Sequence, residues 1–269
     1  MLCTAAAAGA CTGATPTCDE ATASINLSGV QQLVIQNTVA YASCAALPAN
    51  EQGVCGTDLR PFPTLGTDAV EADAVEWATA FSLRFGTGTY TTDANGWSLR
   101  AGQTVTGVPM PTSPVIQNTG GLAVEINAGA TGAALTAVNI VAGGGEGVDS
   151  RDDRVTLTNV DVTCTATGAF HAVHLGGAGN ASVLTDVAID RTNGGGVSAA
   201  LFSSGGTVTL GGTVTVDASE ASGVVLSNTT VSSFSLASVM VDATAIAVAN
   251  RGIALDNVTG TVTVVSADI

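Results

Sequence analysis

The side chains best suited to chemistry are a few acidic, basic and histidine residues in the second half of the chain. The run 147–154, Gly-Val-Asp-Ser-Arg-Asp-Asp-Arg, places Asp149 and Asp152 on either side of Arg151, with Glu125 before the run and His174 after it. Carboxylates beside a histidine can carry out general acid–base catalysis. The same run has the composition of a polar turn, in which each local Arg–Asp pair is worth about 0–1 kcal/mol. The candidate catalytic residues are therefore Glu125, Asp149, Asp152 and His174, and a plain polar turn is the alternative.

A repeated phrase identifies the elements that must position these side chains. The six-residue pattern Leu-x-x-Val-x-(Val/Ile) occurs at 135–140, 157–162, 184–189 and 236–241, with one extra residue at 210–216 and a degenerate copy from Val262. The leading residues are 22, 27, 26, 26 and 26 residues apart. A fixed period in this range is typical of a solenoid, in which each repeat forms one coil.

Each coil is expected to contain at least two short strands. A second apolar column lies nine residues before the leading residue, at Ile126, Val148, Leu175 and Leu201. Alternate residues of a strand point to one face, and strands of successive coils stack about 4.8 Å apart. This alignment places Glu125, Gly147 and His174 in one outward column, with Asp149 two positions further along its strand. We therefore expect the candidate residues to share one polar patch, whereas His171 falls at an inward position and is expected to be a hydrogen-bonded core residue.

The composition excludes several classes of protein. Only 11% of the 269 residues are charged and 46% are apolar, which indicates an ordered chain. The net charge is −15, and the seven basic residues are all Arg and do not cluster, which argues against binding to nucleic acid or anionic lipid. No run of about 18 apolar residues predicts a membrane span, and no intact signal peptide is visible at the start.

Five of the six cysteines lie in the first 55 residues: Cys3, Cys11, Cys18, Cys44 and Cys55. Their spacing contains no Cys-x-x-Cys pair and both histidines are distant, so we expect no metal site and no cofactor. Disulfides formed in an oxidising compartment are favoured instead, which indicates an extracellular or cell-surface protein. Because five is odd, one cysteine must stay free, pair with Cys164 or pair with another chain. Cys164 alone is expected to be a small buried residue.

Three regions follow from these patterns. Residues 1–66 are expected to form a Cys-rich N-terminal arm or cap region, 67–120 a capping helix and the first coil or coils, and 121–269 the coils of about 26 residues. The helix is predicted over 68–82, because Asp68 and Glu71 fit a capping box and apolar residues follow on one face. Such a helix would cover the open end of the stacked strands. Alternating apolar residues within 24–47, including Leu33 and Ile35, predict short strands.

These features together resemble the right-handed parallel β-helix proteins of the pectin-lyase-like superfamily. The resemblance is carried by the coils at 121–269, by the helix followed by Gly-Thr-Gly-Thr-Tyr at 86–90, and by Ala-Gly-Gln-Thr-Val-Thr-Gly at 101–107. It implies an all-β right-handed parallel β-helix with an N-terminal capping helix. The family includes pectate lyases, polygalacturonases, phage tailspikes, adhesins and autotransporter passengers. Its hydrolases carry an Asn-Thr-Asp motif and its lyases a run of basic residues, and this chain has neither.

The sequence alone therefore favours a structural function over an enzymatic one. We expect a β-solenoid of an extracellular or cell-surface adhesin, sheath or filament that associates end to end, because an uncapped stack of strands exposes unpaired backbone groups. The alternative is a carbohydrate-active enzyme, either a polysaccharide lyase or a glycoside hydrolase, or a carbohydrate-binding β-helix. An enzyme should show converging carboxylates and aromatic side chains on one face, and aromatic residues make up only 4% of the chain.

Overall fold

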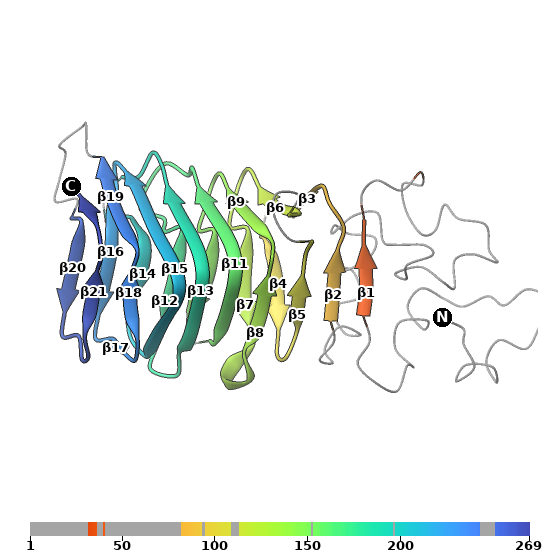
Figure 1. Cartoon of the computed structure of the whole chain (residues 1–269). Coiled ribbons are helices and arrows are strands. Elements are labelled where there is room, and N and C mark those ends of the chain that lie inside the picture. The colour runs from red at the N-terminus through yellow and green to blue at the C-terminus, as the bar shows by residue number, and fades with distance from the viewer. Residues whose placement is uncertain are drawn as a thin grey trace, which may run out of the picture.

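The computed structural model of the chain describes residues 32–36, 40, 82–92, 95–108, 113–151, 153–195, 197–242 and 251–269. These residues form an all-β, right-handed parallel β-helix, so the predicted fold class is confirmed. Figure 1 shows the coils stacked along one axis, with β1 and β2 towards one end and β20 at the other. Among the described residues, no helix is long and apolar enough to cross a membrane.

One face of the β-helix is a seven-stranded parallel sheet to which each coil contributes one strand. Its strands are β4 (Trp97–Arg100), β7 (Val124–Asn127), β10 (Val148–Arg151), β12 (Val173–Gly176), β14 (Ala199–Ser203), β16 (Ser222–Ser227) and β20 (Ile253–Asp256). Because strands of this sheet come from successive coils, residues about one repeat apart become direct neighbours.

The other faces are formed by a thirteen-stranded sheet. Its strands are β1 (Gln32–Ile35), β2 (Ser82–Phe85), β3 (Thr89–Thr91), β5 (Thr104–Thr106), β6 (Val115–Asn118), β8 (Ala133–Thr136), β9 (Asn139–Ala142), β11 (Val155–Cys164), β13 (Ala181–Arg191), β15 (Thr207–Ser219), β17 (Thr230–Val231), β19 (Ser238–Asp242) and β22 (Ala267–Asp268). A separate pair, β18 (Phe234–Leu236) and β21 (Val262–Val264), and the short 3₁₀ helix η4 (Gly129–Thr131) complete the described elements.

The repeated phrase forms a corner of each coil. Its third residue has a positive φ in four successive copies, at Ala137 (55°), Asn159 (54°), Asp186 (54°) and Gly212 (61°). This left-handed conformation bends the strand, and short polar residues and glycine adopt it more readily than other types. Leu157 and Val160, on either side of the bend, are both completely buried. The phrase therefore directs apolar side chains into the core from two sides of one corner.

The second apolar column is present, but the predicted nine-residue offset holds for only two of its five buried members below. The buried partners in the seven-stranded sheet are Val124, Val148, Val173, Leu201 and Val224. The column lies nine residues before the leading Leu for Val148 and Leu201, eleven before it for Val124 and Val173, and twelve before it for Val224, because the intervening turns differ in length. A shift of two keeps the same face of the strand, so the predicted inward and outward sides hold for Val124 and Val173. The shift of three at Val224 reverses them in β16, where Val224 is buried and Val225 is partly exposed.

Register also differs at the C-terminal copies of the phrase. The extra residue after Leu210 produces a bulge between β13 and β15, where the pairing shifts between Thr185 and Val187. In the next coil Val239 pairs with Val216, two positions from the partner that the repeat predicts.

The N-terminal predictions are tested only in part. The strand expected around Leu33 and Ile35 is present as β1, which pairs with β2. Ser82, the last residue of the predicted helix, instead begins β2, and the rest of that helix lies outside the described residues. The five N-terminal cysteines also lie outside them, so disulfides there stay a prediction that mass spectrometry of the unreduced, alkylated protein would test. Cys164 is free and fully buried, as expected for a small core residue.

Candidate functional site

A single outward column of the seven-stranded sheet brings most of the predicted site residues together. The register partners along it are Ser98, Glu125, Asp149, His174 and Phe202, from β4, β7, β10, β12 and β14. Glu125, Asp149 and His174 therefore lie on one face, as the sequence predicted. Asp149 takes the position between the other two that the sequence alignment had assigned to Gly147, and this correction follows from the two-residue difference in turn length.

Glu146 joins this column from the turn between β9 and β10. The turn contains Gly143, Gly144 and Gly145, and a Cβ at any of them would clash with backbone atoms of residues 119–122 in the preceding coil. Only glycines allow the two turns to stack this closely. The turn therefore packs directly against the preceding coil, and the Glu146 carboxylate lies beside β10.

Glu146, Asp149 and His174 form a compact cluster. The Nδ1 atom of His174 lies 3.8 Å from Glu146 Oε1 and 3.8 Å from Asp149 Oδ1. One polar atom from each of the three residues lies within 4.8 Å of the others. The three side chains are 15%, 6% and 11% exposed, in that order, so the cluster sits in a largely dehydrated setting.

Arg151 holds Asp149 in place and balances its charge. Arg151 Nε donates to both carboxylate oxygens of Asp149, at 2.9 and 3.0 Å, and Nη2 forms a close ion pair with Oδ2. Burial alone would raise the pKa of Glu146, but the nearby His174 imidazole, its own backbone amide and the Arg151 guanidinium outweigh burial and lower that pKa. Glu146 is therefore ionised at neutral pH and available as a proton acceptor.

An aromatic group borders the cluster on the side of the following coil. The His171 and Phe202 rings are stacked, with centroids 4.3 Å apart and planes 12° apart, and both meet His174 edge-on at 4.9 Å. His171 is 7% exposed and its Nδ1 accepts the backbone N–H of Ala199 at 3.0 Å. The prediction that His171 is a buried, hydrogen-bonded residue is confirmed.

His171 should make stability depend on pH in the mildly acidic range. Burial, and next the neighbouring His174, lower the pKa of His171 from 6.5 to about 4. Because the unfolded chain then binds a proton that the folded chain resists, the free energy of unfolding should fall as pH drops from 6.5 to 4, by at most about 1.4 kcal/mol per pH unit. Urea unfolding at pH 7 and pH 4.5 measures this.

The control for this pH effect is His171→Asn, whose amide oxygen can still accept the Ala199 N–H. The variant should lose less stability than the wild type between the two pH values. Parallel losses in the two proteins would mean that His171 does not control the transition.

A small polar cleft continues from the cluster along the same face. It has a volume of about 140 Å³ and is lined by Glu125, Ile126, Asn127, Asp149, Arg151 and Asp153. Glu125 Oε2 accepts hydrogen bonds from Ser98 Oγ at 2.8 Å and from Asn127 Nδ2 at 3.3 Å. Glu125 therefore borders the cleft and does not belong to the compact cluster.

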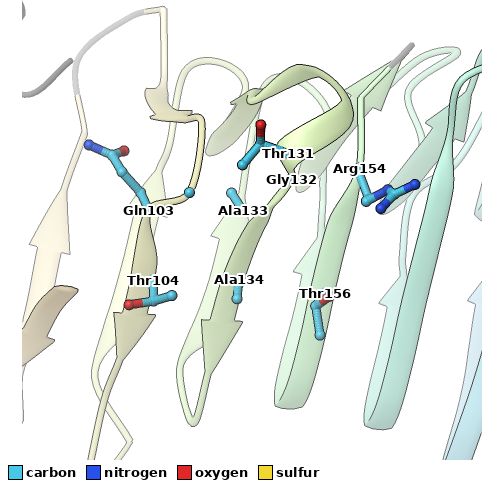
Figure 2. Close-up of a pocket in the computed structure, with 9 residues that line it drawn as sticks. Gln103, Thr104, Thr131, Gly132, Ala133, Ala134, Arg154 and Thr156 are labelled. Atoms are coloured by element: carbon cyan, nitrogen blue, oxygen red, sulfur yellow. The ribbon is translucent and has the colours of Figure 1, made fainter. Parts of the chain in front are cut away.

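A second cavity, on another face, does not fit the chemistry that the sequence predicted. Its volume is about 220 Å³, and Figure 2 shows it between the rungs of Thr104 and Thr156, with Gln103 and Arg154 at its edges. The hollow arises because the intervening rung carries only the small residues Gly132, Ala133 and Ala134. Its lining residues include no carboxylate and no histidine, so this cavity offers no acid–base pair.

Two residues of the site were missed by the sequence analysis, and one predicted residue is not described. Asp152 lies outside the described residues. Glu146 lies eleven residues before Leu157, where other coils carry the apolar Val124 and Val173, and Phe202 lies beside the apolar Leu201 with no signal of its own. A charged residue interrupting an otherwise apolar column was the signal that could have identified Glu146.

Comparisons with known proteins give a likeness of fold and no family. No family model matches the chain, and no curated protein matches it. Among solved structures, the chain is similar to pectin methylesterase PemA from Erwinia chrysanthemi, with 12% sequence identity and a TM-score of 0.45. The match covers 76% of this chain and 66% of that chain, just under two thirds of its length. The two sequences share too few residues for a site to be carried from one to the other.

Proposed function

We propose that the protein is a carbohydrate-active β-helix enzyme that cleaves a polysaccharide at the outward face of the seven-stranded sheet. The observation that carries the proposal is the convergence of Glu146, Asp149 and His174 beside the Phe202 ring. Converging carboxylates and an aromatic side chain on one face are the features that separate an enzyme from a purely structural solenoid. The proposal therefore takes the alternative interpretation of the sequence over the adhesin or filament.

The charges and exposure of the cluster suggest a role for each group. Cleavage of a glycosidic bond requires one group to accept a proton and another to donate one. The ionised Glu146 carboxylate suits the acceptor, and the His174 imidazole beside it suits the donor. Asp149 is only 6% exposed and is bound by Arg151, so it acts as a positioning residue for His174.

The surroundings suit a sugar polymer better than a small apolar ligand. Phe202 is partly exposed and can pack against a sugar ring, and the Arg151 side chain is 57% exposed and can donate to hydroxyl or carboxylate groups. The polar cleft next to Glu125 extends this surface along the stacked coils. Pectin and alginate, which belong to the polymers to be assayed, lie outside the cell, so the proposed location of the protein is extracellular.

Activity measurements on variants of the cluster test the proposal. Wild-type protein should cleave a member of a panel of pectin, polygalacturonate and alginate, assayed with and without divalent cations. Glu146→Gln should lower the rate by about 100-fold or more, because it removes the proton acceptor while keeping the shape of the side chain.

Asp161→Asn is the matched control, since Asp161 lies in β11 on a different face and its loss removes the same charge. Its rate should equal that of the wild type. Absence of turnover on every polymer, or equal rates for Glu146→Gln and wild type, would contradict the proposal. The structural solenoid would then be favoured over the enzyme. Association end to end into a filament stays a prediction, which sedimentation at rising protein concentration would test.

A further inference from the structure

We infer that Glu146, Asp149 and His174 form a binding site for one divalent transition-metal ion of the Zn²⁺ class. The inference goes beyond the proposed activity and does not rest on it, because the ion can be measured without any polysaccharide. It also departs from the prediction of no metal site, which rested on the cysteine spacings and on the distance of both histidines from the cysteines.

The His174 imidazole is the first observation. His174 is 9% exposed, and its buried Nδ1 atom has no hydrogen-bond partner in the described structure. The two carboxylate oxygens that face this atom lie 3.8 Å away, beyond the 2.7–3.2 Å of a hydrogen bond. Buried polar atoms are almost always satisfied, so an atom that points between two carboxylates without bonding to either calls for a missing partner.

The spacing suits a metal ion better than a direct contact. An ion bound at about 2.0–2.2 Å in tetrahedral geometry holds its ligand atoms about 3.4 Å apart. The two 3.8 Å separations from His174 need only a few tenths of an ångström of closure to reach that value, and the two carboxylates lie within 4.8 Å of each other. A tetrahedral ion would also keep a fourth position for water.

The donor set indicates the class of ion. One imidazole nitrogen with two carboxylate oxygens is a ligand set that Zn²⁺ accepts, whereas Ca²⁺ and Mg²⁺ prefer oxygen ligands alone. Two carboxylates and a neutral imidazole carry a charge of about −2, which a divalent ion neutralises.

The groups behind the ligands are already arranged to orient them. Arg151 Nε donates to both carboxylate oxygens of Asp149 and Nη2 contacts Oδ2 alone, so Oδ1, which lies 3.8 Å from His174 Nδ1, accepts only one of these contacts. His171 is not a fourth ligand through Nδ1, because that atom accepts the Ala199 N–H, but its ring packs edge-on against His174 and fixes the imidazole plane. Such outer contacts hold metal ligands in position and raise affinity. With an ion bound, Glu146 and His174 would be ligands instead of proton acceptor and donor, and a water on the ion would supply the proton acceptor.

Direct metal binding is the test. Full-length protein is stripped with EDTA, its accessible thiols are alkylated so that the N-terminal cysteines cannot bind zinc, and Zn²⁺ is titrated by calorimetry. Co²⁺ is added in parallel as a spectroscopic probe of the coordination geometry. The expected result is about one ion per chain with a tetrahedral Co²⁺ spectrum.

Variants locate the ion. Glu146→Gln and His174→Gln should each weaken Zn²⁺ binding by at least about tenfold. Mutating a residue that only contacts a metal ligand already costs about that much affinity, and these variants remove the ligands themselves. Asp161→Asn, on another face, should bind as the wild type does. Glu146 lies in a turn, so its variant should melt like the stripped wild type, which shows that lost binding is not lost folding. No saturable binding, or equal binding by wild type and both cluster variants, would overturn the site. Cleavage assays have no part in this result, so failure of the proposed enzyme activity would leave it standing.

Discussion

Replacing Arg191 with Met is expected to lower the free energy of unfolding by about 3–5 kcal/mol. Each hydrogen bond to a charged group is worth about 1.5–3 kcal/mol and several are lost, but removing a buried charge offsets part of that loss. Arg191 is completely buried, and its guanidinium donates to the carbonyls of Phe170 at 2.9 Å, Gly168 at 3.1 Å and Cys164 at 3.2 Å, with a further close contact to Thr192. Methionine fills similar space but has no donor, so all of these carbonyls would lose the Arg191 contact. The Cys164 and Gly168 carbonyls would keep only the backbone N–H groups of Thr192 and Gly195.

The expected loss is a difference between opposing effects. Burial lowers the pKa of Arg191, which shows that desolvation of the charge works against folding. The several charge-assisted hydrogen bonds are worth more than this penalty, because they tie the 164–172 connection to β13. A melting temperature lower by about 10 °C is expected for a chain of this size.

Arg191→Lys separates charge from geometry. Lysine keeps the positive charge but concentrates its donors at one point, so it cannot reach carbonyls that surround a planar guanidinium. It should recover less than half of the lost stability. Arg154→Met, at an exposed position, should change stability by less than about 0.5 kcal/mol. Chemical unfolding of the three variants measures this, and a loss below 1 kcal/mol in Arg191→Met would show that the connection is held by other contacts.

Leu184→Ala is expected to cost about 2–5 kcal/mol, the range for truncating a buried leucine. Leu184 is fully buried and stacks between Leu157 and Leu210 of the neighbouring coils. Because strands above and below hold the backbone in register, the core cannot collapse into the cavity, and the loss should lie in the upper part of this range.

Thr185→Ala is the matched control, one residue along the same strand. Thr185 is partly exposed and lies in an outward column beside Thr158. Its truncation should change the free energy of unfolding by less than about 0.5 kcal/mol. Thermal and urea unfolding compare the two variants directly, and equal losses would mean that the inward and outward sides of β13 are assigned wrongly.

Much of the fold could be predicted because stacking of the coils places the same packing requirement on every repeat. Each inward position sees the same position of the coils on either side, so Leu135, Leu157, Leu184 and Leu210 occupy one column and leave a visible period. The bend inside the phrase was not predicted. Ala137, Asn159, Asp186 and Gly212 share a backbone conformation but not a side-chain type, so the corner left no pattern.

The sequence could predict which face carries the candidate site, but not the register of the strands within that face. Outward positions carry no repeated packing requirement, and the turns that join the two sheets change length by two residues from coil to coil. Alternation along each strand was sufficient to place Glu125 and His174 on one face. It could not tell whether Gly147 or Asp149 lay between them.

The sequence by itself therefore determined the parallel β-helix, its inward and outward sides and the face that carries the polar residues, because these depend on periodicity and on side-chain types that the core repeats. The tertiary structure alone decided that Glu146 meets Asp149 and His174 and that Arg191 ties down the 164–172 connection. Both contacts join a turn to a strand, and their geometry depends on turn length and on glycines that stack backbone on backbone, which no period in the sequence records.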